Sequence, residues 1–155
     1  TLFPYTTLFR SASIEDVFKA CRKAGIIILD NESMEFECLN IFGVSYSFEN
    51  RSVPDIDESI IKEGLVNIII YHVPYNWQGF SRMGFDIQLS GHTHGGQFYP
   101  VINFSELIFK YNRGLFKNSL GKYLHVTTGV GSMDTPMRWG TDSELVILKL
   151  KNKCN

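Results

Sequence analysis

The chain lacks the features that mark several large classes of protein. Its formal net charge is −1 over 155 residues, which gives no indication of a nucleic-acid partner. No apolar run approaches the roughly 20 residues that span a bilayer. It has three cysteines, an odd number without C-x-x-C spacing, and we expect ordinary thiols in a reducing compartment. With 44% hydrophobic residues, the chain can build a core of one domain or part of one.

Histidine is also scarce, yet two of the four histidines stand two residues apart in the segment Gly91-His92-Thr93-His94-Gly95-Gly96-Gln97. The preceding residues 85–90 alternate between apolar and polar, as a half-buried strand does. Residues i and i+2 of an extended segment point to one side, so both imidazoles can face one metal or two neighbouring metals. The glycines permit a positive φ and a close approach to a ligand. The alternative is a glycine-rich turn with two solvated histidines, and the length of the motif favours the metal site.

A third histidine follows another predicted strand. The β-branched run Val66-Asn67-Ile68-Ile69-Ile70-Tyr71 is typical of a buried strand, and it leads directly into His72-Val73-Pro74. This position favours His72 as a metal ligand. The fourth histidine, His125, lies inside the alternating segment 123–127, on the same face as Tyr123 and Thr127, and we expect it to be structural.

These motifs resemble those of the calcineurin-like metallophosphoesterases, in particular the bacterial branch that carries G-H-T-H-G-G-Q. The resemblance covers residues 12–155 nearly throughout. It implies an α/β fold that forms the C-terminal part of a four-layer α-β-β-α sandwich. The segments that carry it are His72-Val73-Pro74, residues 91–97 with Phe98-Tyr99-Pro100, Gly129-Val130-Gly131, Pro136-Met137-Arg138 and Ser143-Glu144-Leu145.

The resemblance also implies a chemistry. It assigns His72 and His92 to one divalent metal ion and His94 to a second, in a dinuclear centre that hydrolyses a phosphomonoester or phosphodiester. Imidazole suits Mn, Zn, Fe or Ni, and the metal identity stays open. The implied partner is a small-molecule or lipid-linked phosphoester, and no nucleic acid is expected. The implied location is the bacterial cytoplasm or the cell envelope.

The remaining motifs of that family are absent from the chain. D-x-H, G-D-x-x-D and G-N-H supply carboxylate ligands and a catalytic histidine, and no such motif occurs here. Residues 1–11 resemble the translation of a sequencing adapter, so we expect them to be a non-native segment joined to a truncated domain at residues 12–155. We therefore assign no catalytic or cofactor-binding residue, and we expect the fragment to be inactive. A membrane anchor, if there is one, would lie in the missing N-terminal half.

A second interpretation is a degenerate, non-catalytic metal-binding or scaffold module in which these histidines hold a single zinc. For either interpretation the periodicity predicts the same elements. Helices are expected from Ile14 to just before Gly25 and over 55–63, and the aromatic residues after residue 74 are expected to line a cleft or to pack in a loop. The expected strands are 26–30, one or two within 34–47, 66–71, 85–90, 123–128 and 144–150.

Overall fold

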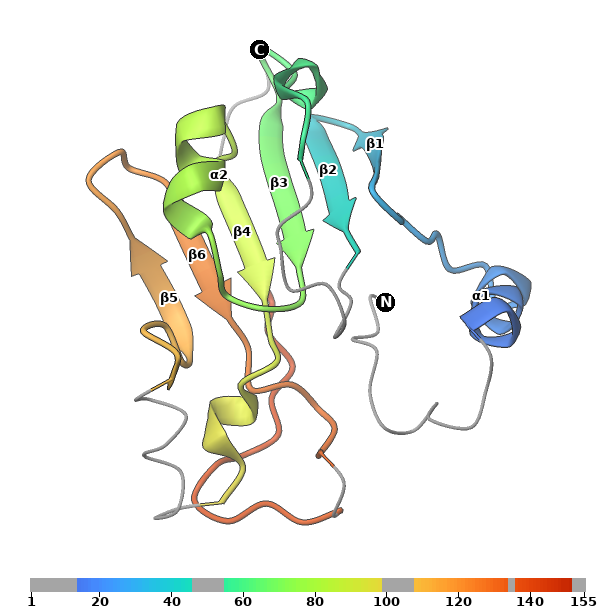
Figure 1. The fold of residues 1–155 in the computed structure, drawn as a ribbon, viewed down its shortest axis with the longest axis vertical. Helices are drawn as coiled ribbons and strands as arrows, with labels where there is room; N and C mark the ends of the chain where they lie inside the picture. Colours follow the sequence, from blue (N-terminus) through green and yellow to red (C-terminus); the bar gives the residue numbers. More distant parts are fainter. Residues whose placement is uncertain (1–13, 46–54, 99–107, 134–135, 152–155) are drawn as a thin grey trace.

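The protein is described by a computed structural model that covers residues 14–45, 55–98, 108–133 and 136–151 (Figure 1). In these residues a six-stranded sheet has the order β1-β2-β3-β4-β6-β5. The fold is α/β, as the sequence predicts. The elements are α1 Ile14–Lys23, β1 Glu32–Phe36, β2 Leu39–Val44, the 3₁₀ turn η2 Glu58–Ile60, β3 Val66–Tyr71, α2 Trp77–Met83, β4 Ile87–Ser90, the 3₁₀ turn η3 His94–Gly96, β5 Gly114–Lys117 and β6 Tyr123–Val126.

The centre of the sheet is parallel. Strands β2, β3, β4 and β6 run in one direction, while the edge strands β1 and β5 pair antiparallel with their neighbours. The carboxyl ends of parallel strands meet at one edge of a sheet, which is where ligand sites of open α/β sheets form. The loops that follow β3, β4 and β6 therefore lie side by side, at the lower end of the sheet in Figure 1.

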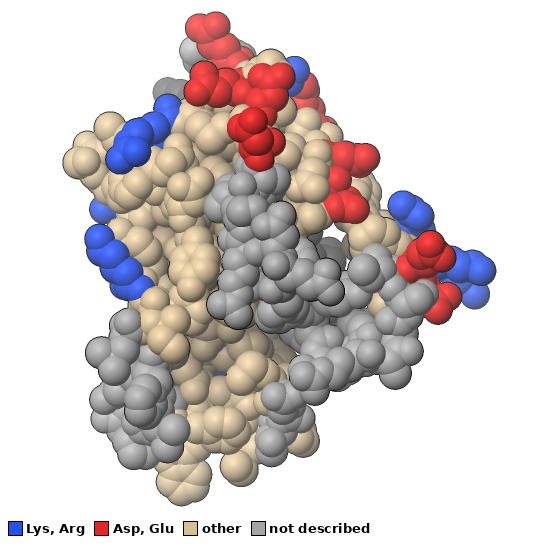
Figure 2. Space-filling model, in the orientation of Figure 1, with Lys and Arg blue, Asp and Glu red and all other residues tan. Residues whose placement is uncertain are grey.

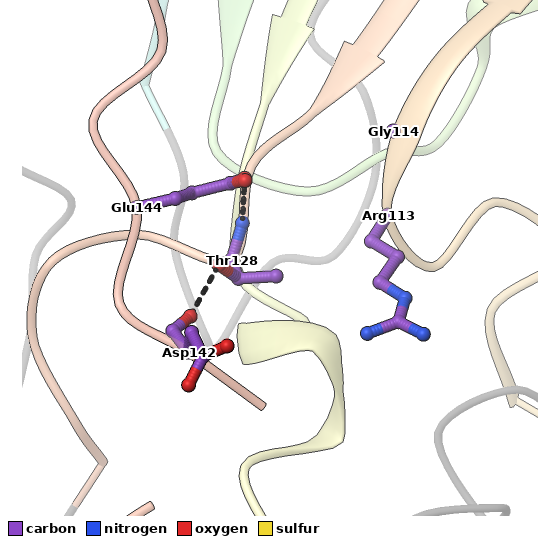
Figure 3. A pocket seen from close by; sticks show the side chains of 5 residues that line it. All are labelled: Arg113, Gly114, Thr128, Asp142 and Glu144. Atoms are coloured by element: carbon purple, nitrogen blue, oxygen red, sulfur yellow. Dashed lines mark hydrogen bonds between the residues drawn. The ribbon is translucent and has the colours of Figure 1, made fainter. Parts of the chain in front are cut away.

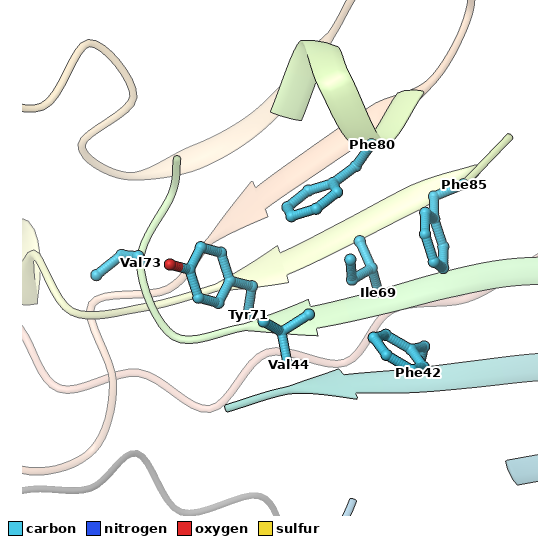
Figure 4. Packing of buried hydrophobic residues seen from close by; sticks show 7 residues of the cluster. All are labelled: Phe42, Val44, Ile69, Tyr71, Val73, Phe80 and Phe85. Atoms are coloured by element: carbon cyan, nitrogen blue, oxygen red, sulfur yellow. The ribbon is translucent and has the colours of Figure 1, made fainter. Parts of the chain in front are cut away.

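Helix α2 covers one face of the sheet and defines its core. Trp77 and Phe80 point from this helix onto the strands and are buried. Phe80 packs edge-on against Tyr71, with ring centroids 6.0 Å apart. Figure 4 shows this side chain above residues of β2 and β3. The larger apolar cluster consists of Phe42, Val44, Ile69, Tyr71, Val73, Phe80 and Phe85, and the smaller one of Trp77, Leu124 and Val126.

The opposite face of the sheet, called the open face below, is apolar but much less buried. The register places Phe36 beside Leu39 and Leu115 beside His125 on this face. Phe36 and Leu115 are 56% and 60% exposed. The other residues on this face include Met34, Ile41, Ile70, Ile87, Leu89 and Tyr123, all half-buried. Helix α1 lies apart from the sheet in Figure 1.

Several predicted strands and helices are confirmed, and others are wrong. Helix α1 and the strands before His72 and Gly91 match their predictions, as do β1, β2 and β6. Segment 26–30 is not a strand, and Leu29 lies directly against Gly43 of β2. Segment 144–150 is also not a strand, and Leu145 and Ile147 are more than four-fifths exposed. Apolar alternation alone therefore does not make a strand.

Three further features differ from the sequence predictions. The helix expected over 55–63 is only the 3₁₀ turn η2, which Asp57 caps through its side chain and which ends at an extended Ile61. Trp77 and Phe80 belong to helix α2 and pack in the core, which settles the choice between cleft and packing for these two. Cys38 is disulfide-bonded, so the expectation of three ordinary thiols is wrong, while Cys21 is free.

Two further predictions concern the N-terminal segment and membrane-spanning helices. Residues 1–11, expected to be a non-native segment, lie outside the described residues. Among the helices that are described, none is long and apolar enough to cross a membrane.

Candidate metal centre

Two predicted ligands meet at the ends of neighbouring strands. His72 directly follows β3, and His92 follows β4 by one residue. The backbone N–H of Gly91 donates to the carbonyl of His72 at 3.0 Å, which ties the two loops together. Nδ1 of His92 lies 3.0 Å from Nε2 of His72. The two rings meet edge-on, with centroids 4.8 Å apart. Thus two histidines that are 20 residues apart share one place in the fold.

Buried polar side chains of β4 hold the loop that carries His72. The amide of Gln88 donates to the carbonyls of Val73 and Tyr75 at 3.4 and 3.1 Å. The hydroxyl of Ser90 donates to the same Val73 carbonyl at 3.2 Å. Both side chains are buried beneath the α2 face. This network couples the loop after β3 to the strand that presents His92. The sequence did not predict this hydrogen-bond network. The feature that could have indicated it is the pair of polar residues, Gln88 and Ser90, at alternate positions of a strand.

The G-H-T-H-G-G-Q segment is a tight turn with an unusual backbone. His92 has φ 70° and His94 has φ 51°, which is the left-handed region that residues with a side chain rarely adopt. Thr93 stands between them, and its hydroxyl donates to the carbonyl of Asn112 at 2.5 Å. Such conformations cost free energy and concentrate at functional sites, where the surrounding structure maintains them. The strain therefore supports a functional interpretation of the turn.

Burial keeps the imidazole of His72 neutral. Desolvation is the main cause that lowers the pKa of His72 to about 4, and the nearby His92 and His94 contribute to this lowering. A neutral imidazole offers the nitrogen lone pair that a metal ion requires. The rings have little freedom, because His92 also packs against Phe109 with centroids 5.4 Å apart and Phe109 stacks on Tyr75 at 5.5 Å.

His94 is half-buried and is held from the other side of the turn. The guanidinium of Arg138 donates to the carbonyl of His94 at 3.3 Å, and its Nη2 lies 3.4 Å from Nδ1 of the His94 ring. Burial lowers the pKa of His94, the charge of Arg138 lowers it as well, and a hydrogen bond to the backbone of Gly131 partly offsets both. Arg138 belongs to the motif Pro136-Met137-Arg138, but the sequence predicts no role for it.

Gln97, the last residue of the motif, holds two residues of the later loop by hydrogen bonds. Its side chain is 2% exposed. Its amide donates to the carbonyl of Met133 at 2.8 Å, and its side-chain oxygen accepts from the N–H of Met133 at 2.6 Å. Its backbone carbonyl accepts from the N–H of Trp139 at 2.8 Å. Gln97 therefore fixes the later loop against the histidine turn.

The described residues do not form a complete metal site. Among them, no group of three or more His, Cys, Asp or Glu side chains lies close enough to hold a metal ion. The structure pairs His72 with His92 and places His94 nearby. His125 sits inside β6, paired with Leu89 and Leu115. The paired imidazoles fit a metal as a partial donor set, and no third ligand joins them in the described part of the chain.

A small cavity lies beyond the turn, on the side of Arg113 (Figure 3). Its volume is about 410 Å³, and Arg113, Gly114, Thr128, Asp142 and Glu144 line it. Figure 3 shows Arg113 on one wall and the two carboxylates on the other. Glu144 is fixed there, since its carboxylate accepts from the N–H of Thr128 at 2.8 Å. The acidic side chains on the surface gather elsewhere, at the end of the molecule where β3 begins (Figure 2).

The chain is similar to several known proteins. The chain is 31% identical over 146 residues to an uncharacterized metallophosphoesterase of Helicobacter pylori, an alignment that covers 90% of the chain and 40% of that protein. It is 42% identical over 71 residues to an uncharacterized metallophosphoesterase of Aquifex aeolicus, covering 45% of the chain and 27% of that protein. It is 33% identical over 151 residues to the protein YpbG of Bacillus subtilis, covering 91% of the chain and 53% of that protein.

No protein-family profile matches the chain, and no solved structure matches it. The chain spans about 40% of the length of the Helicobacter relatives it matches. The two Helicobacter relatives and one from Campylobacter jejuni share the description uncharacterized metallophosphoesterase. The chain belongs to the metallophosphoesterase family.

Proposed function

We propose that this chain is the C-terminal part of a metallophosphoesterase domain that hydrolyses a phosphomonoester or phosphodiester at a dinuclear divalent-metal centre. One observation carries the proposal: His72 and His92, at the ends of adjacent parallel strands, bring their ring nitrogens within 3.0 Å of each other. Two neutral imidazoles at this spacing need only a small rotation to bind the same cation. In this proposal His72 and His92 serve one metal, and His94 serves the other.

The residues of the chain would bind and orient rather than transfer protons. His72 is neutral near pH 7 because burial lowers its pKa to about 4, so it would bind a cation without first losing a proton. Gln88 and Ser90 fix the loop that carries His72. The left-handed backbone at His92 and His94 shapes the turn in which these two residues lie. When bound, two divalent ions would supply a nucleophilic water of lowered pKa and would stabilise the charge that develops on the phosphoryl group.

The open face supports the larger architecture that the family resemblance implies. A sheet with one face under a helix and an apolar second face has a layer still to be covered. In a four-layer α-β-β-α sandwich, a second sheet would pack on the face that carries Phe36, Ile70 and Leu115. That sheet would also bring the carboxylate ligands and the catalytic histidine. The substrate, a small-molecule or lipid-linked phosphoester, would bind between the metals and these added groups.

A second candidate function is a non-catalytic metal-binding or scaffold module. The observation that favours it is the lack of any three-ligand group among the described residues. A single zinc held by two or three imidazoles, with water completing the coordination, would then be the whole site. Such a module would bind a metal but would show no phosphoesterase activity when extended by the upstream sequence of its gene.

The test compares the 155-residue chain with the longer protein that its parent gene encodes. Both are assayed with Mn or Zn on an aryl phosphomonoester and an aryl phosphodiester. We expect turnover only from the longer protein, with loss of that turnover in His92→Ala. His125→Ala is the matched control, because this half-buried histidine lies on the neighbouring strand outside the site and should leave turnover unchanged. Turnover by the short chain that survives His92→Ala would refute the mechanism.

The same assay separates the two candidates. Metal binding by the longer protein without turnover on either substrate would favour the scaffold module. Absence of metal binding in the longer protein would exclude both.

A further inference from the structure

Arg138 connects the histidine turn to the loops that follow β6. Its guanidinium donates to the carbonyl of Thr128 at 2.7 Å, which is the best-formed of its contacts. The remaining acceptors are backbone carbonyls as well, and they come from three separate stretches of the chain. They are His94, Gly129, Gly131 and Asp142. A planar guanidinium with five donors can serve such a set, and no other side chain can.

The Gly131 carbonyl is the acceptor that matters for the histidine. Both Nε and Nη2 of Arg138 contact this carbonyl, the former at 3.1 Å. The ring of His94 hydrogen-bonds to the same Gly131 backbone. Nη2 also lies 3.4 Å from Nδ1 of His94, longer than the usual N–H donor distance of about 2.9–3.0 Å. Nδ1 is therefore the ring nitrogen that faces the guanidinium.

We propose that Arg138 is a positioning residue for His94: by holding the Gly131 carbonyl, it keeps Nδ1–H of His94 donating to that carbonyl and leaves Nε2 free for a ligand. This inference rests on the proposed function for the identity of the ligand, a divalent metal ion. Histidines that bind metals generally donate their other ring N–H to a carboxylate or a backbone carbonyl, which fixes both the tautomer and the ring orientation. Here the acceptor would be a carbonyl that a guanidinium holds in place.

Charge alone does not explain the arrangement. A guanidinium beside an imidazole repels its protonated form, and a metal ion at Nε2 would add further repulsion. Because the donors of Arg138 are directed to carbonyls, its contribution is geometric. Loss of the side chain would free the Gly131 carbonyl and several loop carbonyls together. The ring of His94 would then lose its fixed acceptor, and both tautomers would become populated.

The test reads the tautomer directly in the 155-residue chain without metal. Long-range ¹H–¹⁵N correlation spectra of the histidine rings distinguish Nδ1–H from Nε2–H. We expect His94 to be mainly in the Nδ1–H form. In Arg138→Met we expect the tautomer ratio to move toward Nε2–H by roughly tenfold, which corresponds to about 1.4 kcal/mol. Arg113→Met is the matched control, since this exposed arginine lies near the same loops and makes no described hydrogen bond to the turn.

A second variant keeps the test decisive if Arg138→Met does not fold. Arg138→Lys retains the charge but cannot serve the whole set of carbonyls, so it should shift the ratio in the same direction. The proposal is overturned if wild-type His94 is mainly Nε2–H, or if a folded Arg138 variant leaves the ratio unchanged. Zinc titration of the same samples gives an independent readout. A changed tautomer with no zinc affinity in any sample would sustain the positioning role while counting against the proposed metal function.

Discussion

The two faces of the sheet differ in what covers them. Under α2, the side chains are almost fully buried whether they are apolar, such as Ile69, or polar, such as Gln88. On the open face, apolar residues such as Ile87 and Leu89 are only half-buried. Strand β4 shows the contrast within four residues, because its polar side chains point to the covered face and its apolar ones to the open face.

The difference shows that the covered face has both a stabilising and a positioning role. Its apolar clusters stabilise the sheet, while Gln88 and Ser90 direct the loop that carries His72. The open face has apolar surface of a kind that is otherwise covered in a folded domain. It is the face on which a second layer would pack under the proposed architecture. The edge that carries His72 and His92 lies between the two faces, at the carboxyl ends of the strands.

The largest expected effect tests whether the covered face alone supports the fold. Phe80→Ala removes a fully buried ring from the α2 cluster and should lower the free energy of unfolding by about 3–5 kcal/mol. Phe36→Ala makes the same change on the open face, where the ring is 56% exposed, and should cost well under half as much. Urea unfolding followed by circular dichroism measures both. Equal losses would mean that the open face is covered in solution, for example by self-association.

A substitution with an intermediate expected effect on the free energy of unfolding tests the hydrogen-bond network of Gln88. Gln88→Met keeps the shape of the side chain but removes the donor to the carbonyls of Val73 and Tyr75, and it should cost about 1–3 kcal/mol. Gln78→Met is the same substitution at an exposed position of α2, and it should stay within about 0.5 kcal/mol. Denaturation gives the free energies. Ring spectra of His72 should also change in Gln88→Met, and an unchanged His72 would show that the network does not position this loop.

The smallest expected effect concerns a carboxylate near the open face. Burial acts to raise the pKa of Glu144, but hydrogen bonds from Thr128 and Thr127 and the charge of His125 outweigh it, and the net pKa is lowered. A lowered carboxyl pKa contributes stability above the unfolded-state value near 4.5, and this stability is lost as the pH falls through the lowered value.

The wild-type chain should therefore lose a small amount of stability on acidification that Glu144→Gln does not lose. Thermal unfolding at a series of acidic pH values measures the difference between the two proteins. Parallel curves would show that Glu144 is not held by Thr127 and Thr128 in solution.

The site was predictable to the extent that short motifs define it. The motifs at residues 72–74 and 91–97 identified His72, His92 and His94 as candidate ligands, and the structure brings the first two together. Whether they bind a metal is still a prediction. The roles of Gln88 and Arg138 were not predictable, because each depends on backbone carbonyls that are distant in the sequence.

For the fold, the sequence by itself determined the strands before His72 and Gly91, because local apolar patterning is sufficient to specify them. The α/β class followed from the resemblance of the histidine motifs to those of a known family. Only the tertiary structure decided which face of β4 is buried. The alternation of Ile87 and Leu89 with polar residues suggests that the apolar side is inside, yet α2 covers the other side. The tertiary structure also decided that residues 144–150 form no strand in the described chain. The physical reason is that pairing and burial depend on the neighbours an element finds in space, and a segment's own residues do not specify those neighbours.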